Sequence, residues 1–101
     1  MLAQFSIVPL DKGVSVGSEV AKVLQIIDNS GLPYKLNPMG TVVEGTWDEV
    51  MELIRTCHEE TVHGSERVLT SITIDDRKGM QNRIEGKIKS LEKRLNKSLR
   101  K

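Results

Sequence analysis

Glu44 is the residue whose type and position most strongly suggest chemistry. It ends the stretch Thr41-Val42-Val43, which is otherwise uncharged and has the composition of a strand. A carboxylate within an apolar strand is costly to bury unless it has a partner. We expect that partner to be an arginine, a cluster of hydroxyl groups or a cationic ligand.

His58 and Cys57 suggest metal or nucleophilic chemistry, but their surroundings argue against both. The segment from His58-Glu59 to His63 resembles a zinc-protease motif, which needs two histidines four residues apart. Here the histidines are five apart, about 500° around a helix, so we expect them to diverge and to bind no metal. We expect His58 at a helix surface or pocket edge. Cys57 is best interpreted as a small core residue, because no activating base accompanies it.

Asp75-Asp76-Arg77 places two neighbouring carboxylates where a strand is expected to end. Paired carboxylates can bind a metal or share a proton. However, adjacent strand residues point to opposite faces, so pairing with an arginine is the favoured interpretation. The sequence contains no glycine-rich phosphate loop and no nucleophile elbow. We therefore predict no catalytic residues and no enzyme activity.

Four strands are predicted from alternating or β-rich segments. Alternation favours strands over residues 2–8 and 67–74, and residues 34–38 and 41–44 form two short strands. The turn between the two short strands contains only Met39 and Gly40, which implies a hairpin.

Three helices complete the prediction. The first follows Ser15 as its N-cap and stops at residues 29–31, with Gly31 as a left-handed C-cap. The second begins at the capping box Thr46-x-x-Glu49 and ends near residues 61–64. The third spans roughly residues 80–99, with a narrow apolar seam. The order β-α-β-β-α-β-α in one domain, residues 1–101, predicts an α+β ferredoxin-like fold. It is a two-layer sandwich on a four-stranded antiparallel sheet, with an added C-terminal helix.

One face of this sheet carries the polar residues of interest. If one set of strand residues faces the helices (Phe5, Ile7, Ile72 and Ile74), the opposite face presents another set (Gln4, Ser6, Leu69, Ser71 and Thr73). Such a face can simply be solvated. It can also form an interface or a pocket, because small hydroxyl and amide side chains leave room and offer hydrogen bonds. Both interpretations stay open on this evidence.

The charges divide the chain into two parts. Residues 1–76 carry five Lys and Arg against twelve Asp and Glu, a formal charge of −7, whereas residues 77–101 carry +8. A basic segment can neutralise nucleic-acid phosphates. However, the three aromatic residues, Phe5, Tyr34 and Trp47, all lie outside it, so no base-stacking surface accompanies the charge. We expect the basic segment to pack on the acidic surface of a neighbouring subunit, and we expect no nucleic-acid partner.

The cysteine count and hydropathy suggest a compartment. Cys57 is the single cysteine, so neither an internal disulfide nor a cysteine-rich zinc site is expected. No apolar run approaches the roughly 20 residues that span a bilayer, and no secretory signal is visible. We expect a cytoplasmic protein with no membrane partner.

Several segments together resemble a known family. The stretch Leu36–Val50 is similar to the signature of the small thiamine-binding proteins, once catalogued as an uncharacterised protein family. Further similarities, in order along most of the chain, are Val8-Pro9-Leu10, Ser15 with Val20-Ala21, His58, Arg67-Val68 and Ile74-Asp75-Asp76-Arg77. The chain departs from the pattern at Asp11-Lys12-Gly13 and at Lys78-Gly79.

The resemblance implies a ferredoxin-like fold with an extra C-terminal helix. It also implies dimers that associate further, giving a homotetramer that is a dimer of dimers. Family members bind thiamine or a related pyrimidine and are not known as enzymes.

The leading hypothesis is therefore non-catalytic binding of thiamine or a related aromatic cation, with no further cofactor and no metal. Glu44 would face the cation or anchor the pyrimidine, and His58 and Arg67 would lie at the pocket margin. The hydrogen-bonding hydroxyls would come from Ser6, Thr41, Ser71 and Thr73. The alternative is a structural or regulatory oligomer without a ligand, in which the open sheet face is only a subunit interface. An enzyme of the dimeric ferredoxin-like type would require a converging titratable pair, which the sequence does not show.

Overall fold

The computed structural model describes residues 1–11, 17–78 and 84 of the 101-residue chain. The predicted N-cap Ser15 lies outside this part of the chain, as does nearly all of the predicted helix over residues 80–99. Among the residues that are described, no helix combines the length and the apolar character needed to cross a bilayer.

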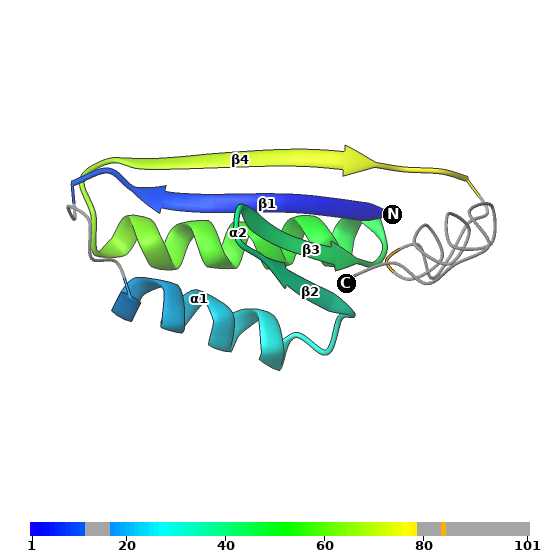
Figure 1. Ribbon diagram of the computed structural model, residues 1–101, viewed down its shortest axis with the longest axis horizontal. Helices are drawn as coiled ribbons and strands as arrows, with labels where there is room; N and C mark the ends of the chain where they lie inside the picture. The colour runs from blue at the N-terminus through cyan, green and yellow to red at the C-terminus, as the bar shows by residue number, and fades with distance from the viewer. Residues whose placement is uncertain (12–16, 79–83, 85–101) are drawn as a thin grey trace.

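Four strands and two helices follow one another in the predicted order β-α-β-β-α-β (Figure 1). The strands are β1 (Leu2–Pro9), β2 (Tyr34–Asn37), β3 (Gly40–Glu44) and β4 (Val68–Asp75), and the helices are α1 (Gly17–Asn29) and α2 (Trp47–His63). The sheet order is β2-β3-β1-β4, and every neighbouring pair is antiparallel. The predicted ferredoxin-like α+β sandwich is confirmed.

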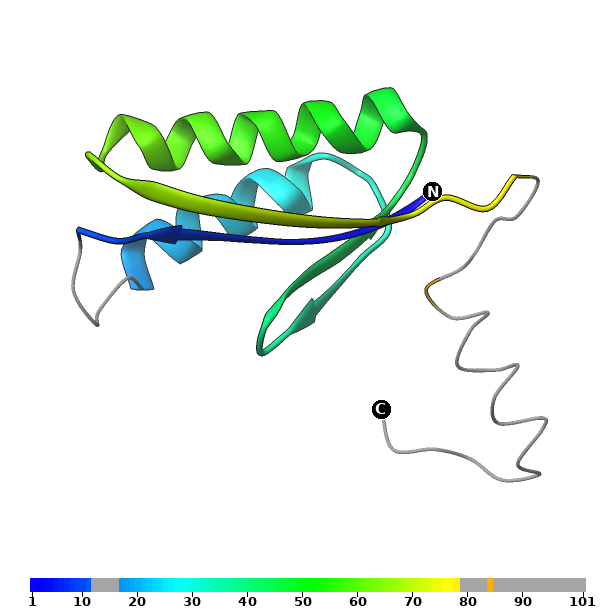
Figure 2. The ribbon, with the colours of Figure 1, turned by 90° about the horizontal axis from the view of Figure 1, so that it is seen from above.

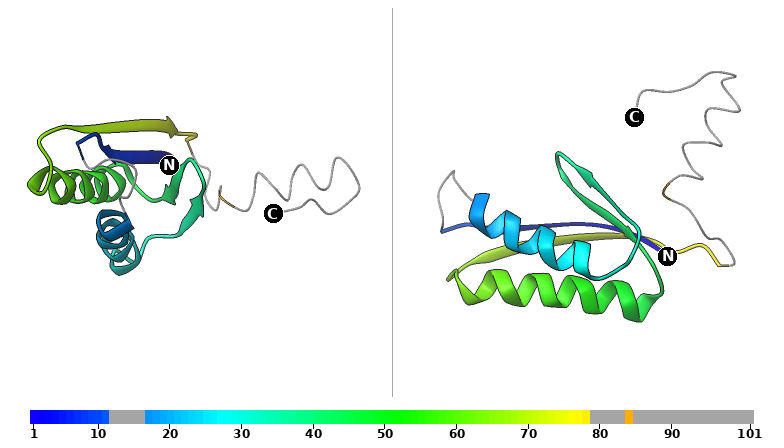
Figure 3. Two further views of the ribbon diagram at one scale, coloured as in Figure 1. Left: turned by 60° about the vertical axis from the view of Figure 1, so that its left-hand side comes forward. Right: turned by 90° about the horizontal axis from the view of Figure 1, so that it is seen from below.

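Both helices cover the same face of the sheet and pack side by side against each other, as the near end-on view shows (Figure 3). The view from above shows that the β2–β3 hairpin bends away from the helices toward its tip (Figure 2). The sheet's opposite face has no helix over it in the described part of the chain. This two-layer arrangement leaves one face available for other contacts.

The core lies between the helices and the two central strands. Its fully buried members are Ile27 of α1, Val43 of β3, and Val50 and Cys57 of α2. The predicted core position of Cys57 is therefore confirmed. Trp47 is 54% exposed, because it is the first residue of α2 and lies at the end of the core.

The predicted capping box at the start of α2 and the predicted left-handed glycine after α1 are both confirmed. Thr46 Oγ1 accepts a hydrogen bond from the Glu49 N–H at 3.2 Å, and Glu49 Oε1 accepts one from the Thr46 N–H at 2.9 Å. This is the expected capping box, and it fixes the start of α2 directly after Glu44. Gly31 adopts a φ of +77° just beyond α1, which is the left-handed conformation that a C-terminal glycine provides.

Candidate ligand-binding site

The open face of the sheet brings four of the predicted site residues together. Ser6 of β1 is the register partner of Ser71 on β4, and Gln4 is the partner of Thr73. Leu2 pairs with Glu44 on one side and with Asp75 on the other. Directly paired residues share a face, and successive residues alternate. Since Ala3 and Phe5 are buried beneath the helices, these polar side chains occupy the opposite face.

Glu44 stands at one end of this face and is half-buried. Its main-chain N–H donates to the Pro33 carbonyl at 3.0 Å, which ties the end of β3 to the approach to β2. Its Oε1 accepts a hydrogen bond from the Ile84 N–H at 3.4 Å. The carboxylate that was expected to need a partner therefore has a main-chain donor as one of its contacts.

The structure places the other three predicted residues away from Glu44. Thr41 pairs with Phe5, so its side chain lies on the helix-facing side of the sheet. His58 lies on α2, and its Nδ1 is 2.6 Å from Thr70 Oγ1 on β4. Arg67 is exposed in the loop before β4, and its carbonyl accepts a hydrogen bond from the Leu10 N–H at 2.8 Å.

A cleft of about 490 Å³ lies on the helix-facing side, between α1 and the β2–β3 hairpin. Ligand pockets generally fall between about 300 and 1,000 Å³ and are mostly apolar with a few polar groups. Thr41 and Ser6 both line this cleft, although the register of Ser6 with Ser71 places the Ser6 side chain on the open face. Most of the other lining residues were missed from the sequence: Ile7, Glu19, Val20, Val23, Leu24, Leu36, Asn37 and Met39.

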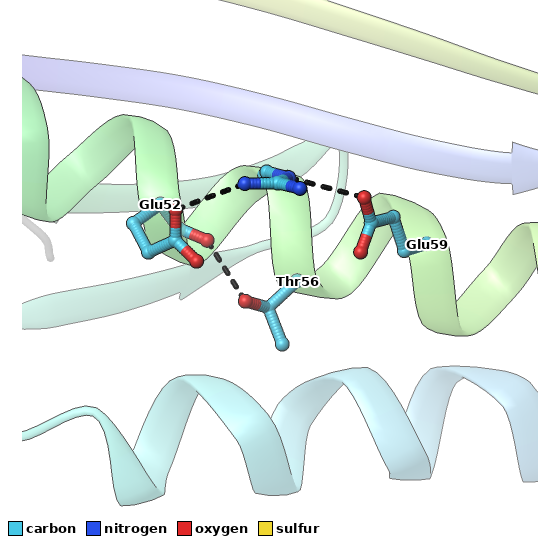
Figure 4. Close-up of polar contacts among 4 residues, drawn as sticks. Glu52, Thr56 and Glu59 are labelled. Carbon is cyan, nitrogen blue, oxygen red and sulfur yellow. Dashed lines mark hydrogen bonds and ion pairs between the residues drawn. The ribbon is translucent and has the colours of Figure 1, made fainter.

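The exposed surface of α2 is acidic. Arg55 donates from Nε to Glu59 Oε1 at 3.1 Å, and its Nη1 is 3.8 Å from Glu52 Oε2 (Figure 4). The hydrogen bond that Arg55 donates to Glu59 raises the pKa of the Arg55 guanidinium. Exposed pairs of this kind add little stability, so their main effect is on the surface potential. An acidic surface attracts small cations toward the molecule.

The groups with nucleophilic or metal-binding potential are not assembled for such chemistry. Burial raises the pKa of the Cys57 thiol to about 11, so it stays protonated at neutral pH. His58 is engaged by Thr70, whereas His63 is exposed near the end of α2. Within residues 1–11, 17–78 and 84, no group of three or more His, Cys, Asp or Glu side chains is gathered to hold a metal ion.

Comparison with known proteins agrees with the fold and with the sequence resemblance. Residues 3–92 match the model of a family described as thiamine-binding protein. The UPF0045 protein MJ1052 of Methanocaldococcus jannaschii is 37% identical over 91 residues, covering 90% of this chain and 91% of that protein. The UPF0045 protein YqgV of Bacillus subtilis is 34% identical over 100 residues, covering 93% of this chain and 96% of that protein.

Solved structures show the same architecture. The crystal structure of MJ1052 superimposes with a TM-score of 0.82 at 38% identity, covering 89% of this chain and 93% of that one. The crystal structure of TM0486 of Thermotoga maritima superimposes with a TM-score of 0.78 at 21% identity, covering 89% of this chain and 96% of that one. At that lower identity, the similarity supports the fold alone.

Proposed function

We propose, from the premise that this chain belongs to the family of thiamine-binding proteins, that it binds thiamine or a related pyrimidine or aromatic cation without catalysing a reaction. The observation that carries the proposal is the arrangement of the open sheet face. There the Ser6–Ser71 pair and Thr73 offer hydroxyls on the same side as the Glu44 carboxylate. No acid–base machinery is needed for binding alone.

Each proposed contact follows from the chemistry of thiamine. Its thiazolium ring carries a permanent positive charge, which the Glu44 carboxylate complements. Its pyrimidine has hydrogen-bond donors and acceptors, which hydroxyl groups can satisfy in either direction. We assign these hydrogen bonds to Ser6, Ser71 and Thr73, with Thr41 reached from the helix-facing side. We keep His58 and Arg67 as residues at the margin of the site.

The described titratable groups support binding over catalysis. The Cys57 thiol is buried, and its raised pKa disfavours the reactive thiolate. His58 is held by Thr70, more than half-way along α2 and on the opposite side of the sheet from Glu44. A nucleophile or general base has to reach a reacting atom together with its partners. These residues are not arranged in that way.

We further propose that the protein acts as a homo-oligomer, a homotetramer built as a dimer of dimers. The open face is uncovered in the described part of one chain, and Val8 and Leu69 leave apolar surface on it, 43% and 55% exposed. β4 is an eight-residue edge strand, and such edges readily pair with another chain. The proposal includes a cytoplasmic location, because a single buried cysteine suits a reducing compartment.

The proposed role of Glu44 is tested by comparing Glu44→Gln with a matched control. Equilibrium dialysis with radiolabelled thiamine should show binding weakened by about tenfold or more in Glu44→Gln, because a hydrogen-bonded charge contact contributes roughly 1.5–3 kcal/mol. Glu59→Gln makes the same chemical change on the exposed surface of α2 and should bind like the wild type. Equal affinities for all three proteins would remove Glu44 from the site.

A structural oligomer without a ligand is the second candidate, favoured by the apolar Val8–Leu69 pair on the open face. It predicts a tetramer in sedimentation experiments that is unaffected by thiamine and has no affinity for it. A strictly monomeric protein at micromolar concentration would contradict both candidates.

A further inference from the structure

Leu2 is buried on the open face of the sheet, although α1 and α2 both lie against the other face (Figure 3). Its register partners Glu44 and Asp75 flank it on the neighbouring strands, so the three side chains form a row across β3, β1 and β4. Leu2 is only 7% exposed, whereas Val8 and Leu69 are 43% and 55% exposed further along the same face. Strand neighbours alone leave Val8 and Leu69 open to solvent, which points to an additional cover over Leu2.

The chain that leaves β4 returns to this row of side chains. The main-chain N–H of Ile84 donates to Glu44 Oε1 at 3.4 Å, and Ile84 is itself half-buried. β4 ends at Asp75 on the edge of the sheet, whereas Glu44 belongs to β3, and β1 lies between these two strands. Neighbouring strands lie about 4.8 Å apart, so the return from Asp75 to Glu44 covers roughly 10 Å across the sheet. It spans the position of Leu2.

The sequence from Ile84 onward complements this end of the sheet in charge and in apolar character. Residues 84–101 carry seven Lys and Arg against two Glu, whereas residues 1–76 carry a formal charge of −7. Opposite charges of this kind fix how two surfaces pair. A narrow apolar stripe in a charged segment is typical of a segment that packs on an apolar surface. The stripe here consists of Ile84, Ile88, Leu91 and Leu95.

We propose that the chain's own C-terminal segment, beginning at Ile84, docks on the Glu44–Leu2–Asp75 row with Ile84 over Leu2, and that it competes there with a cationic ligand. The Ile84 N–H already uses Glu44 Oε1, which is one of the two oxygens of that carboxylate. A bound cation and a segment of net positive charge also repel each other at a single carboxylate. The docking stands on the contacts above, whereas the competition rests on the proposed function for its ligand.

The docking is tested by exchanging Ile84 for a polar residue and measuring the exposure of Leu2. A soluble paramagnetic probe broadens methyl resonances that are open to solvent, so the Leu2 methyls should broaden severalfold more in Ile84→Asn than in the wild type. Val62 is 45% exposed on α2, so Val62→Asn is the matched control and should leave the Leu2 methyls protected. Equal protection in Ile84→Asn and the wild type would overturn the docking. Thermal unfolding checks that both variants remain folded.

Isotope labelling decides whether the segment docks on its own chain. Protein labelled at both leucine and isoleucine methyls should show a nuclear Overhauser effect between Leu2 and Ile84. A mixture of chains labelled only at leucine with chains labelled only at isoleucine should not show it, because the two labels then lie on different molecules. A cross-peak in the mixed sample would contradict the proposal and assign the cover over Leu2 to a second copy.

The competition is tested with thiamine as the probe, by equilibrium dialysis of the same full-length variants. Ile84→Asn should bind thiamine about tenfold more tightly than the wild type, which is the change expected if the segment is docked in roughly nine molecules of ten. Val62→Asn should match the wild type. Equal or weaker binding by Ile84→Asn would overturn the competition. If none of the three proteins binds thiamine, the proposed function fails, and the methyl measurements still decide the docking.

Discussion

Gly40 connects the hairpin, the sheet and the cleft, and replacing it with alanine should damage all three. A Cβ built at this position would lie 2.9 Å from the Phe5 carbonyl oxygen and 3.4 Å from Gln4 Cγ. The closer contact is with main chain of the central strand, which cannot rotate away as a flexible side chain could. The φ of +159° is also one that side-chain-bearing residues rarely adopt.

The expected loss of stability in Gly40→Ala is the sum of two contributions, the unfavourable φ and the close approach to the Phe5 carbonyl. An unfavourable backbone conformation costs about 1–3 kcal/mol. Moving β3 away from the Phe5 carbonyl weakens a main-chain hydrogen bond at the end of the ladder, which adds about 1 kcal/mol. We therefore expect Gly40→Ala to lower the free energy of unfolding by about 2–4 kcal/mol, a large share of the 5–15 kcal/mol typical of a domain. Urea titration followed by circular dichroism measures this directly.

Substitutions at two other glycines separate the contribution of φ from that of the close contact. Gly31 has a φ of +77° but open space around its Cβ position, so Gly31→Ala should show the backbone term alone, about 1 kcal/mol. Gly17 lies at the start of α1 with open space and no positive φ, so Gly17→Ala should be neutral or stabilising by up to about 1 kcal/mol. If Gly40→Ala costs no more than Gly31→Ala, the close approach of β3 to Phe5 is not the constraint described above.

Three further predictions concern α2. The pKa of about 11 at Cys57 should make its reaction with a disulfide reagent at pH 8 about 100-fold slower than that of a thiol with the ordinary value of 9.0, and denaturation should restore the rate. The hydrogen bond from the Thr46 N–H holds the pKa of Glu49 below its ordinary value of 4.5, so Glu49→Ala should lower thermal stability at pH 7. That difference should disappear as the pH falls through the folded-state pKa, and a constant difference down to pH 2 would exclude the capping charge as its cause. Thr70→Val should lower the free energy of unfolding by about 1 kcal/mol by leaving half-buried His58 without its hydroxyl partner, whereas no change in urea titration would make that contact dispensable.

The sequence predicted the elements well, because their signals are local. Alternation in residues 2–8 and 67–74 was enough to put Ser6 and Ser71 on the face opposite Phe5, since the side-chain period of a strand is two. The same rule places the side chains of Thr41 and Glu44 on opposite sides of the sheet, because they are three residues apart on one strand. This separation could be predicted from the spacing alone.

Other features depended on tertiary geometry that no local pattern encodes. The His58–Thr70 contact arises from the way α2 packs across β4, twelve residues away along the chain. The cleft lies where the eight-residue β1 extends past the end of its pairing with the five-residue β3. Each of these strands is one residue longer than predicted, β1 at Pro9 and β3 at Gly40. The apolar residues of α1 could be assigned to one helix face from sequence. Which of them line a cavity depended on how far the hairpin bends from the helices.

Isothermal titration calorimetry of the full-length protein with thiamine tests the central claim most directly. The proposed function predicts saturable heat with millimolar thiamine and a matching rise in the temperature of thermal unfolding, because a ligand that binds the folded state stabilises it. If millimolar thiamine produces no heat of binding and no shift in the unfolding temperature, the claim that this chain binds thiamine is contradicted.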